Sequence, residues 1–318
     1  MNKQKFLTSG LIVALFAFIS CALWGSAFPC VKIGYKMLDI GAEDTSSQIL
    51  FAGIRFTIAG IMVILFSSFR ERHLVAPSKK EIPKVMALSF FQTILQYLLF
   101  YIGLAHTSGV KASVIIGSNV FVAIMISSLV FRREKLTLRK IAGCAAGFAG
   151  IVIINIPDGG FDRNFTLTGE GFMFISTFSY AFSSVLMKKY SVSSNPVMMS
   201  GWQFLFGGAV MALSGAVSGG VFAPESVSAV VMLLYLAFIS AAAYSLWAML
   251  LQYNPVSRVS VYGFINPVIG VILSAVLLKE GESLGYRAVI ALLLVCAGIF
   301  IVNGRIKQNK KAEAGSTE

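Results

Sequence analysis

The sequence predicts an all-α integral membrane protein with ten transmembrane helices, arranged as two five-helix repeats of inverted topology. Three observations lead to this fold class. The 318 residues are 57% hydrophobic and only 13% charged, whereas a soluble domain carries roughly 25% charged residues. The apolar residues form long continuous stretches, unlike the short alternating segments of a β-barrel. Polar and glycine positions also recur between the two halves of the chain.

The same composition excludes two other classes of protein. Disordered chains combine low hydrophobicity with high charge, which is the opposite of this sequence. Small secreted scaffolds depend on dense disulfides, but this chain has 4 cysteines in 318 residues. A single membrane domain therefore remains as the expected organisation.

Ten stretches are long enough to cross a bilayer, because a spanning helix needs about 20 mainly apolar residues. They are residues 7–28, 49–69, 82–104, 110–131, 138–156, 169–187, 197–216, 227–251, 256–278 and 284–302. The stretch at 169–187 is the weakest, since it is rich in Ser, Thr and Phe. The connections are short, so no room is left for a sizeable soluble domain.

The basic residues orient these spans, because cytoplasmic loops collect Lys and Arg. With the N-terminus inside, 19 of the 26 Lys and Arg lie on inner segments, six lie on outer segments, and Arg55 lies within a span. We therefore expect both termini in the cytoplasm and a multi-pass protein of the plasma membrane. The net charge of +12 then faces anionic lipid headgroups. No nucleic-acid partner is expected, since no basic stripe is interleaved with stacking aromatics.

Short segments of the first half recur in the same order in the second half. Gly53-Ile54-Arg55-Phe56 matches Gly201-Trp202-Gln203-Phe204, Trp24-Gly25-Ser26-Ala27-Phe28 matches Tyr180-Ala181-Phe182-Ser183-Ser184, and Lys111, Asn119 and Ser127 match Arg258, Asn266 and Ser274 at one constant offset. These matches predict a first unit at residues 1–157, a second unit at 165–304 and a cytoplasmic polar tail at 305–318. Since five spans is an odd number, the second unit enters the membrane from the opposite side. Inverted repeats are typical of secondary transporters, whose substrate sites lie near the midplane at the repeat interface.

The order of these motifs resembles the EamA family of the drug/metabolite transporter superfamily. The motifs include the Trp24 segment, the Gly53 segment, the acidic ends of the fourth and ninth spans at 131–137 and 277–282, and the glycine-rich helices at 143–155 and 291–303. The resemblance implies ten helices in two EamA repeats and the export or exchange of small metabolites. One departure is Val120, which stands where the family often has proline, whereas Asn266-Pro267 keeps it.

Arg55 is the ionisable residue that lies well inside an apolar stretch, and such residues are functional candidates because buried charge is costly. Two interpretations are open. Its guanidinium could bind a substrate carboxylate or phosphate in bidentate geometry, or it could snorkel to the outer interface or pair with a helix C-terminus. No Asp or Glu occupies the middle of a span, so a membrane-embedded proton relay is not expected.

Polar and aromatic residues within the spans are the other candidates for binding a substrate. They are Trp24, Gln92, Gln96, Tyr97, Asn119, Tyr180, Gln203, Tyr244, Trp247 and Asn266. The alternative is that the amides bond to other helices and that the aromatic rings form interface belts. Lys111 and Arg258 open the fourth and ninth spans, where they would act as gates or as headgroup anchors.

Together these observations predict a secondary transporter of small metabolites, in particular amino acids or related compounds, that works by alternating access and favours export. A channel-like facilitator is the alternative, and an integral-membrane enzyme acting on lipids is disfavoured because no nucleophile–base cluster is present. No enzyme activity, cofactor or metal is expected. The partners are a small-molecule substrate and membrane lipid. A monomer and a homodimer both remain open, since Gly143 and Gly147 could serve a dimer face or an internal contact.

Overall fold

The computed structural model describes residues 3–41, 43–106, 115–154, 165–277 and 286–303, and every regular element in those ranges is a helix. In the first half these are α1 Lys3–Leu7, α2 Gly10–Met37, α3 Thr45–Glu71, α4 Ile82–Leu88, the π-helix η1 Ser89–Leu95, α5 Gln96–Ala105, α7 Asn119–Met125, the π-helix η2 Ile126–Val130 and α8 Leu138–Ile154. In the second half they are the π-helix η3 Leu167–Gly171, α9 Phe172–Tyr190, α10 Pro196–Val217, α11 Val227–Tyr253, α12 Val256–Ser260, the 3-10 helix η4 Val261–Phe264, α13 Ile265–Leu277 and α14 Tyr286–Asn303.

Five of the described helical segments are long and apolar enough to cross a membrane. They are Gly10–Met37, Thr45–Glu71, Ile82–Leu104, Pro196–Val217 and Val227–Tyr253, and Ile115–Val130 and Val289–Asn303 are shorter apolar helices. The other expected spans do not qualify within the described residues. Hydroxyl side chains make α9 more polar, the described part of α8 has 17 residues, and the span at 256–278 is divided by η4.

Several helices extend past the apolar stretches that predicted them. α2 runs to Met37 and contains Pro29, although the expected span ended at residue 28. Proline removes one backbone hydrogen bond, and membrane helices tolerate it where neighbours satisfy the freed group. α3 begins at Thr45, because the Asp44 side chain accepts a hydrogen bond from the Ser47 amide and caps the helix.

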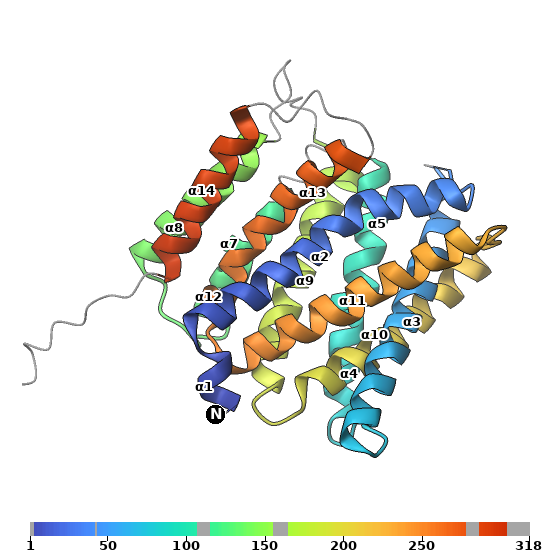
Figure 1. Cartoon of the computed structure of the whole chain (residues 1–318), viewed down its shortest axis with the longest axis horizontal. Coiled ribbons are helices and arrows are strands. Elements are labelled where there is room, and N and C mark those ends of the chain that lie inside the picture. The colour runs from blue at the N-terminus through green and yellow to red at the C-terminus, as the bar shows by residue number, and fades with distance from the viewer. Residues whose placement is uncertain (1–2, 42, 107–114, 155–164, 278–285, 304–318) are drawn as a thin grey trace, which may run out of the picture.

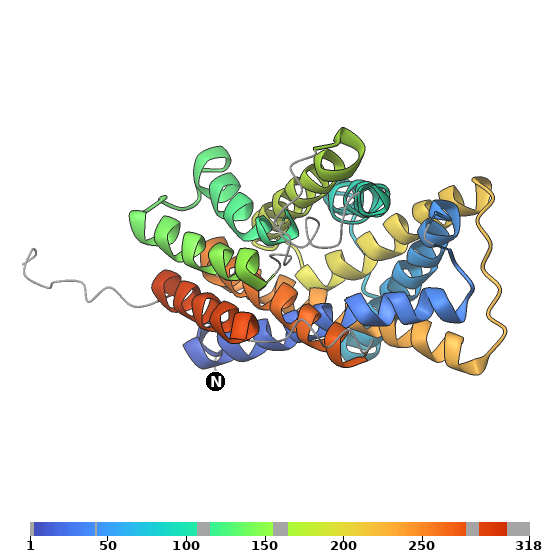
Figure 2. The same cartoon turned by 90° about the horizontal axis from the view of Figure 1, so that it is seen from above.

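Two helix pairs stand at opposite ends of the molecule, with α2, α9, α11 and α13 between them (Figure 1 and Figure 2). α3 packs along α10 at one end, and α8 packs along α14 at the other. α2 lies against α11 and α13, and α9 lies against α5 and α7. The two central helices α2 and α9 therefore connect both ends of the bundle.

Glycines allow the two end pairs to approach closely. A Cβ atom on Gly53 of α3 would lie 2.1 Å from the Ala212 nitrogen of α10, and one on Gly208 would lie 2.4 Å from the Thr57 nitrogen. No real Cβ comes this close to a backbone atom, so the crossing of α3 and α10 requires glycine at these positions.

The second small-residue motif, Gly143 and Gly147 of α8, is used inside the chain. A Cβ on Gly143 would meet Gly298 and Val302 of α14, and one on Gly147 would lie 2.3 Å from the Phe264 ring. Both glycines therefore pack closely against α14 and η4 of the same molecule.

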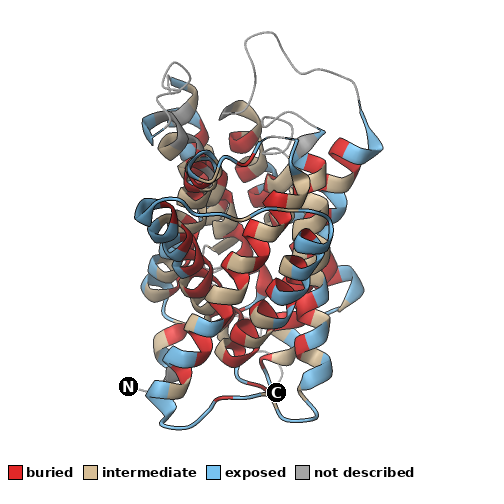
Figure 3. Cartoon of the chain, turned by 90° about the vertical axis from the view of Figure 1, so that its right-hand side faces the viewer, coloured by how far each residue is buried: buried red, intermediate tan, exposed pale blue. Residues whose placement is uncertain are grey.

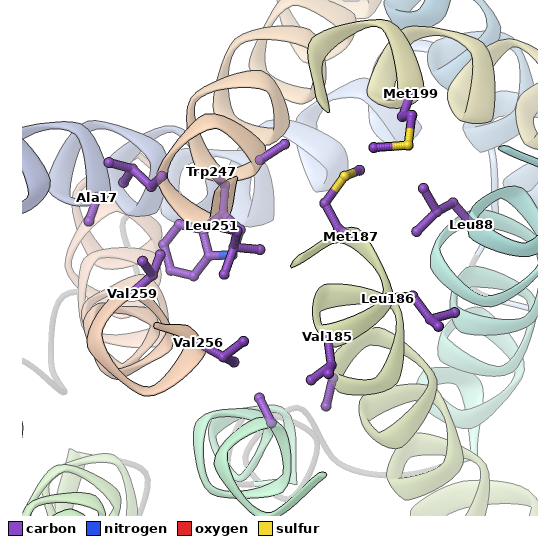
Figure 4. Close-up of a cluster of buried hydrophobic side chains, with 14 of the residues drawn as sticks. Ala17, Leu88, Val185, Leu186, Met187, Met199, Trp247, Leu251, Val256 and Val259 are labelled. Carbon is purple, nitrogen blue, oxygen red and sulfur yellow. The ribbon is translucent and has the colours of Figure 1, made fainter. Parts of the chain in front are cut away.

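Buried residues lie mainly toward the middle of the bundle, and exposed residues lie mainly toward its outer side and its connections (Figure 3). The largest buried cluster joins α2, α4, α9, α10, α11 and α12, with Trp247, Leu251 and Val259 at one side and Met187 and Met199 at the other (Figure 4). Large apolar side chains also cover the outer surface, among them Phe66, Phe69, Leu213 and Phe300. Extended apolar surface of this kind suits contact with another apolar phase.

Replacing the helix cap Asn195 by alanine is expected to lower the stability of the protein by about 1 kcal/mol. The Asn195 side chain accepts hydrogen bonds from the amides of Val197 (2.9 Å) and Met198 (3.3 Å) at the start of α10. Ser9 occupies the same position before α2 but makes no side-chain capping bond, so Ser9→Ala is the matched control. Thermal unfolding in detergent measures both, and equal unfolding temperatures would contradict the capping role.

Candidate functional site

Four predicted aromatic residues meet at the centre of the bundle. The Trp24 ring of α2 lies 4.9 Å from Tyr244 and 5.1 Å from Trp247 of α11, and 6.3 Å from Tyr180 of α9, as centroid distances. Each pair meets edge to face, the arrangement that aromatic quadrupoles favour. Three helices that are distant in sequence therefore build one cluster, which we call the aromatic cluster.

Tyr97 of α5 extends the aromatic cluster toward α3 and α10. Its hydroxyl lies 3.0 Å from the Tyr244 hydroxyl, and its ring lies 4.4 Å from Phe56. Phe56 stacks on Phe204 at 5.3 Å, and Phe204 meets Tyr244 at 4.8 Å. Phe56 and Phe204 were not among the residues predicted from the sequence, although both occupy matching positions in the repeated Gly53 and Gly201 segments.

Around the aromatic cluster, several predicted residues hold buried polar atoms that have no hydrogen-bond partner. These atoms are Trp24 Nε1, Trp247 Nε1, Gln92 Oε1, Gln96 Oε1, Asn119 Oδ1, Asn266 Oδ1 and Gln203 Nε2. A buried donor or acceptor without a partner costs about 1–3 kcal/mol, and native structures contain few of them. All seven atoms belong to residues that the sequence predicted as binding candidates.

The π-helix η1 positions Gln92 and leads into Gln96. π-helical turns occur frequently at functional sites. Two hydroxyls of α9 bond to its main chain, because Ser179 donates to the Phe91 carbonyl (2.6 Å) and Ser176 donates to the Gln96 carbonyl (2.7 Å). These bonds fix the irregular backbone against α9 and hold both glutamines in place.

Asn119 is the first residue of α7, which packs against α9 and η4, and Asn266 is near the start of α13, which packs against α2. A Cβ on Gly263 would lie 3.2 Å from Val120, and one on Gly25 would lie 3.1 Å from the Asn266 carbonyl. The 3-10 turn η4 ends at Phe264, two residues before Asn266. The two amides, which match in the repeat alignment, therefore lie at irregular helix segments, and the main chain of Asn266 lies against Gly25, the residue after Trp24 of the aromatic cluster.

The Arg55 side chain faces the protein interior. It is 4% exposed, and its Nη2 and Nε atoms donate to the Ser240 hydroxyl of α11 at 2.9 and 3.3 Å. Its guanidinium carbon lies 4.9 Å from the centre of the Phe56 ring. Arg55 stands about 15 Å along α3 from Thr45, at a rise of about 1.5 Å per residue, and it does not snorkel. Ser240 was not predicted from the sequence, because it is one of many hydroxyl residues within the spans.

Gln203 of α10 occupies the position that matches Arg55. It is fully buried, and its Oε1 accepts a hydrogen bond of 2.6 Å from the Thr93 hydroxyl of η1. The two matching positions therefore bond to hydroxyl groups on different helices, and one of them carries the charge.

The two cations predicted as gates or anchors give different results. Lys111 lies outside the described residues. Arg258 lies on α12 with Nη1 3.0 Å from the Asn254 oxygen, and Asn254 donates in turn to the Leu7 carbonyl. Arg258 is thus attached to the ends of α11 and α1, and its role as gate or anchor stays a prediction.

Glu134 forms a junction that the sequence did not predict beyond its place in a family motif. Its carboxylate accepts hydrogen bonds from Lys140 Nζ (2.8 Å), the Ser127 hydroxyl (3.2 Å), the Ser257 amide (3.2 Å) and the Ser257 hydroxyl. Burial alone raises the pKa of Glu134, but the bonds from Lys140 and Ser257 outweigh it and hold the pKa below the ordinary 4.5. We call this set the Glu134 junction; it joins η2, α8 and α12.

Comparison with known proteins places this geometry in context. The model described as "EamA-like transporter family" matches residues 11–156 and 167–304. An uncharacterized transporter of Bacillus subtilis, YvbV, is 27% identical over 96% of this chain and 95% of its own length. A protein of Escherichia coli described as a probable amino-acid metabolite efflux pump is 24% identical over 95% of this chain and 98% of its own length. A crystal structure 17% identical in sequence matches with a TM-score of 0.74 over 92% of this chain and 96% of that chain, which shows a shared fold.

Proposed function

Because this chain belongs to the EamA-like transporter family, we propose that it is a secondary transporter that exports small metabolites across the plasma membrane by alternating access. It is a multi-pass membrane protein of the drug/metabolite transporter type. The proposed cargo is an amino acid or a related compound. The described function of the Escherichia coli relative, amino-acid metabolite efflux, supports both the cargo and the direction.

The observation that carries this proposal is the position of the aromatic cluster among unpartnered polar atoms. Trp24 belongs to the first predicted repeat, whereas Tyr180, Tyr244 and Trp247 belong to the second. Substrate sites of transporters with inverted repeats lie at the interface of the two repeats. A cluster that offers ring faces, two indole donors and several amide oxygens suits a small amphipathic molecule.

Helix packing supports the two inverted five-helix repeats. Under the sequence match, the contact of α2 with α11 corresponds to that of α9 with α5, and the contact of α2 with α13 corresponds to that of α9 with α7. The pairs α3–α10 and α8–α14 each join two matching helices. The hydrogen bonds Arg55–Ser240 and Gln203–Thr93 are likewise equivalent.

The positions of basic residues support cytoplasmic ends. α1, which carries Lys3 and Lys5, and the connection from α3 to α4 both lie on the side of the bundle at the bottom of Figure 1. That connection holds Arg72, Lys79 and Lys80. Clustering of Lys and Arg on this side of the bundle agrees with the excess of positive charge in cytoplasmic loops.

Counterflow in proteoliposomes tests the proposed function. Purified protein is reconstituted with an unlabelled metabolite panel inside, and uptake of each labelled compound is followed. An alternating-access carrier gives saturable uptake that the internal compound accelerates. Trp24→Ala is expected to reduce uptake at least about tenfold, a loss of roughly 1.4 kcal/mol, because it removes the ring that joins Tyr244, Trp247 and Tyr180.

The matched control is Phe18→Ala, since Phe18 lies on the same helix with 51% of its surface exposed. Transport no greater than in empty liposomes for every compound would contradict the proposal. Flux that does not saturate and shows no counterflow would favour the channel-like facilitator instead.

A further inference from the structure

Arg55 is a buried cation without an acidic partner among the residues that the structure describes. Its contacts are the neutral Ser240 hydroxyl and the face of the Phe56 ring. A buried charge that lacks a counter-charge is costly, and the cost is greater within a membrane. A structural arginine would be expected to pair with a carboxylate, so the arrangement at Arg55 needs another explanation.

The guanidinium also lies within reach of the aromatic cluster. Phe56, over which it sits, contacts Tyr97 at 4.4 Å, and the Tyr97 hydroxyl lies 3.0 Å from that of Tyr244. One row of side chains therefore leads from the cation to the rings of Trp24 and Trp247.

We propose that Arg55 binds the carboxylate of the cargo, so that the transporter selects metabolites that carry a carboxylate next to an apolar or aromatic body. This inference rests on the proposed function, since it names the class of molecule carried. A guanidinium offers paired N–H donors that match a carboxylate in bidentate geometry. Nη2 and Nε each donate one hydrogen bond to Ser240. Because a guanidinium has five N–H donors, others remain for a carboxylate.

Charge balance favours a single carboxylate over a phosphate. Arg55 supplies one positive charge, and a phosphate dianion bound there would leave excess negative charge in the interior. An amino acid would satisfy more of the site, because its ammonium group can face aromatic rings and the unpartnered oxygens of Gln92, Gln96, Asn119 and Asn266. The indole donors of Trp24 and Trp247 remain for further acceptors on the cargo.

The test compares labelled L-amino acids with their carboxamides in proteoliposome counterflow, for the wild type and for Arg55→Gln. The carboxamide keeps the body of the molecule and removes the charge that Arg55 would bind. Glutamine is the residue at position 203, which matches position 55 in the repeat. The substitution therefore introduces a side chain that the fold already accommodates at the equivalent place in α10. Arg70→Gln is the control, because Arg70 is an exposed cation on the same helix.

The wild type is expected to prefer the acids over the amides by about ten- to hundredfold. This ratio corresponds to the usual free energy of hydrogen bonds to charged groups. Arg55→Gln is expected to lose this preference while it still transports amides, and Arg70→Gln is expected to keep it. Thermal stabilisation of the purified wild type by acids and not by amides gives a second readout. That readout needs no variant, so misfolding of Arg55→Gln leaves the test intact.

Two other results are distinguishable. Transport by the wild type that does not depend on the carboxylate, or a preference unchanged in folded Arg55→Gln, would overturn this inference and leave the proposed function standing. Absence of transport for every acid and every amide would overturn the proposed function together with the inference.

Discussion

Replacing Glu134 by alanine is expected to lower the stability of the folded protein by about 3 kcal/mol and to abolish transport. Removing one partner of a buried ion pair costs about 3–5 kcal/mol. The lower end applies here because the side chains of Glu134 and Lys140 remain 10% and 17% exposed. The loss in transport follows because α12, which Ser257 holds to Glu134, continues through η4 into α13 and the candidate residue Asn266.

The pH dependence of stability tests the same junction. Because the pKa of Glu134 is lowered in the folded protein, the junction contributes its full stability above the ordinary value of 4.5. This contribution is lost as the pH falls through the lowered pKa and the carboxylate is protonated. Glu134→Gln is expected to be less stable at neutral pH and to lose less stability than the wild type on acidification, as measured by thermal unfolding in detergent.

Glu71→Gln is the matched control, because Glu71 and Arg70 form an exposed pair 3.9 Å apart. Exposed pairs contribute little to stability, so this variant is expected to unfold like the wild type. A Glu134→Ala variant as stable as Glu71→Gln would show that the Glu134 junction does not hold α12 in place.

Replacing Gly53 by alanine is expected to lower the stability of the folded protein by a similar amount, about 3 kcal/mol. This value is in the upper part of the range for overpacked interiors. The added methyl group would lie 2.1 Å from the Ala212 nitrogen. A backbone atom cannot swing aside as a side chain can, so α3 and α10 would have to separate along their contact. That separation would also move Arg55 and Phe56, which lie two and three residues after Gly53 on α3.

Gly10→Ala is the control for this substitution, since a Cβ on Gly10 would meet nothing within 4 Å. Thermal unfolding and the yield of folded protein report on both variants, and Gly10→Ala is expected to match or exceed the wild type because alanine favours helix. Equal unfolding temperatures for Gly53→Ala and Gly10→Ala would contradict the close crossing of α3 and α10.

Most of the fold class could be predicted from the sequence, but the ends of helices could not. Hydropathy locates the apolar part of a helix, whereas caps and tertiary contacts set where the helix stops. α3 starts at Thr45 because Asp44 caps it, and α2 continues past Pro29 to Met37 because it packs on α11. The π-helices and η4 carry no sequence signal that hydropathy detects.

The candidate site shows the same division. Trp24, Gln92, Asn119, Trp247 and Asn266 could be selected from sequence, because polar and aromatic residues stand out within apolar stretches. The partners of these residues could not be selected in the same way. Ser240 is one hydroxyl among many in the chain, and Phe56 and Phe204 are apolar residues in apolar helices.

The sequence by itself determined the helical membrane class and the set of candidate residues, because a bilayer permits few backbone structures and makes polar side chains conspicuous. Only the tertiary structure decided what each residue meets. Arg55 faces Ser240 and Phe56 and does not reach an interface, Gly143 and Gly147 face α14 and Phe264, and Glu134 faces Ser257. Apart from that of Arg55 with Phe56, these contacts join residues more than a hundred positions apart. Such pairings arise from helix packing, which local sequence patterns do not encode.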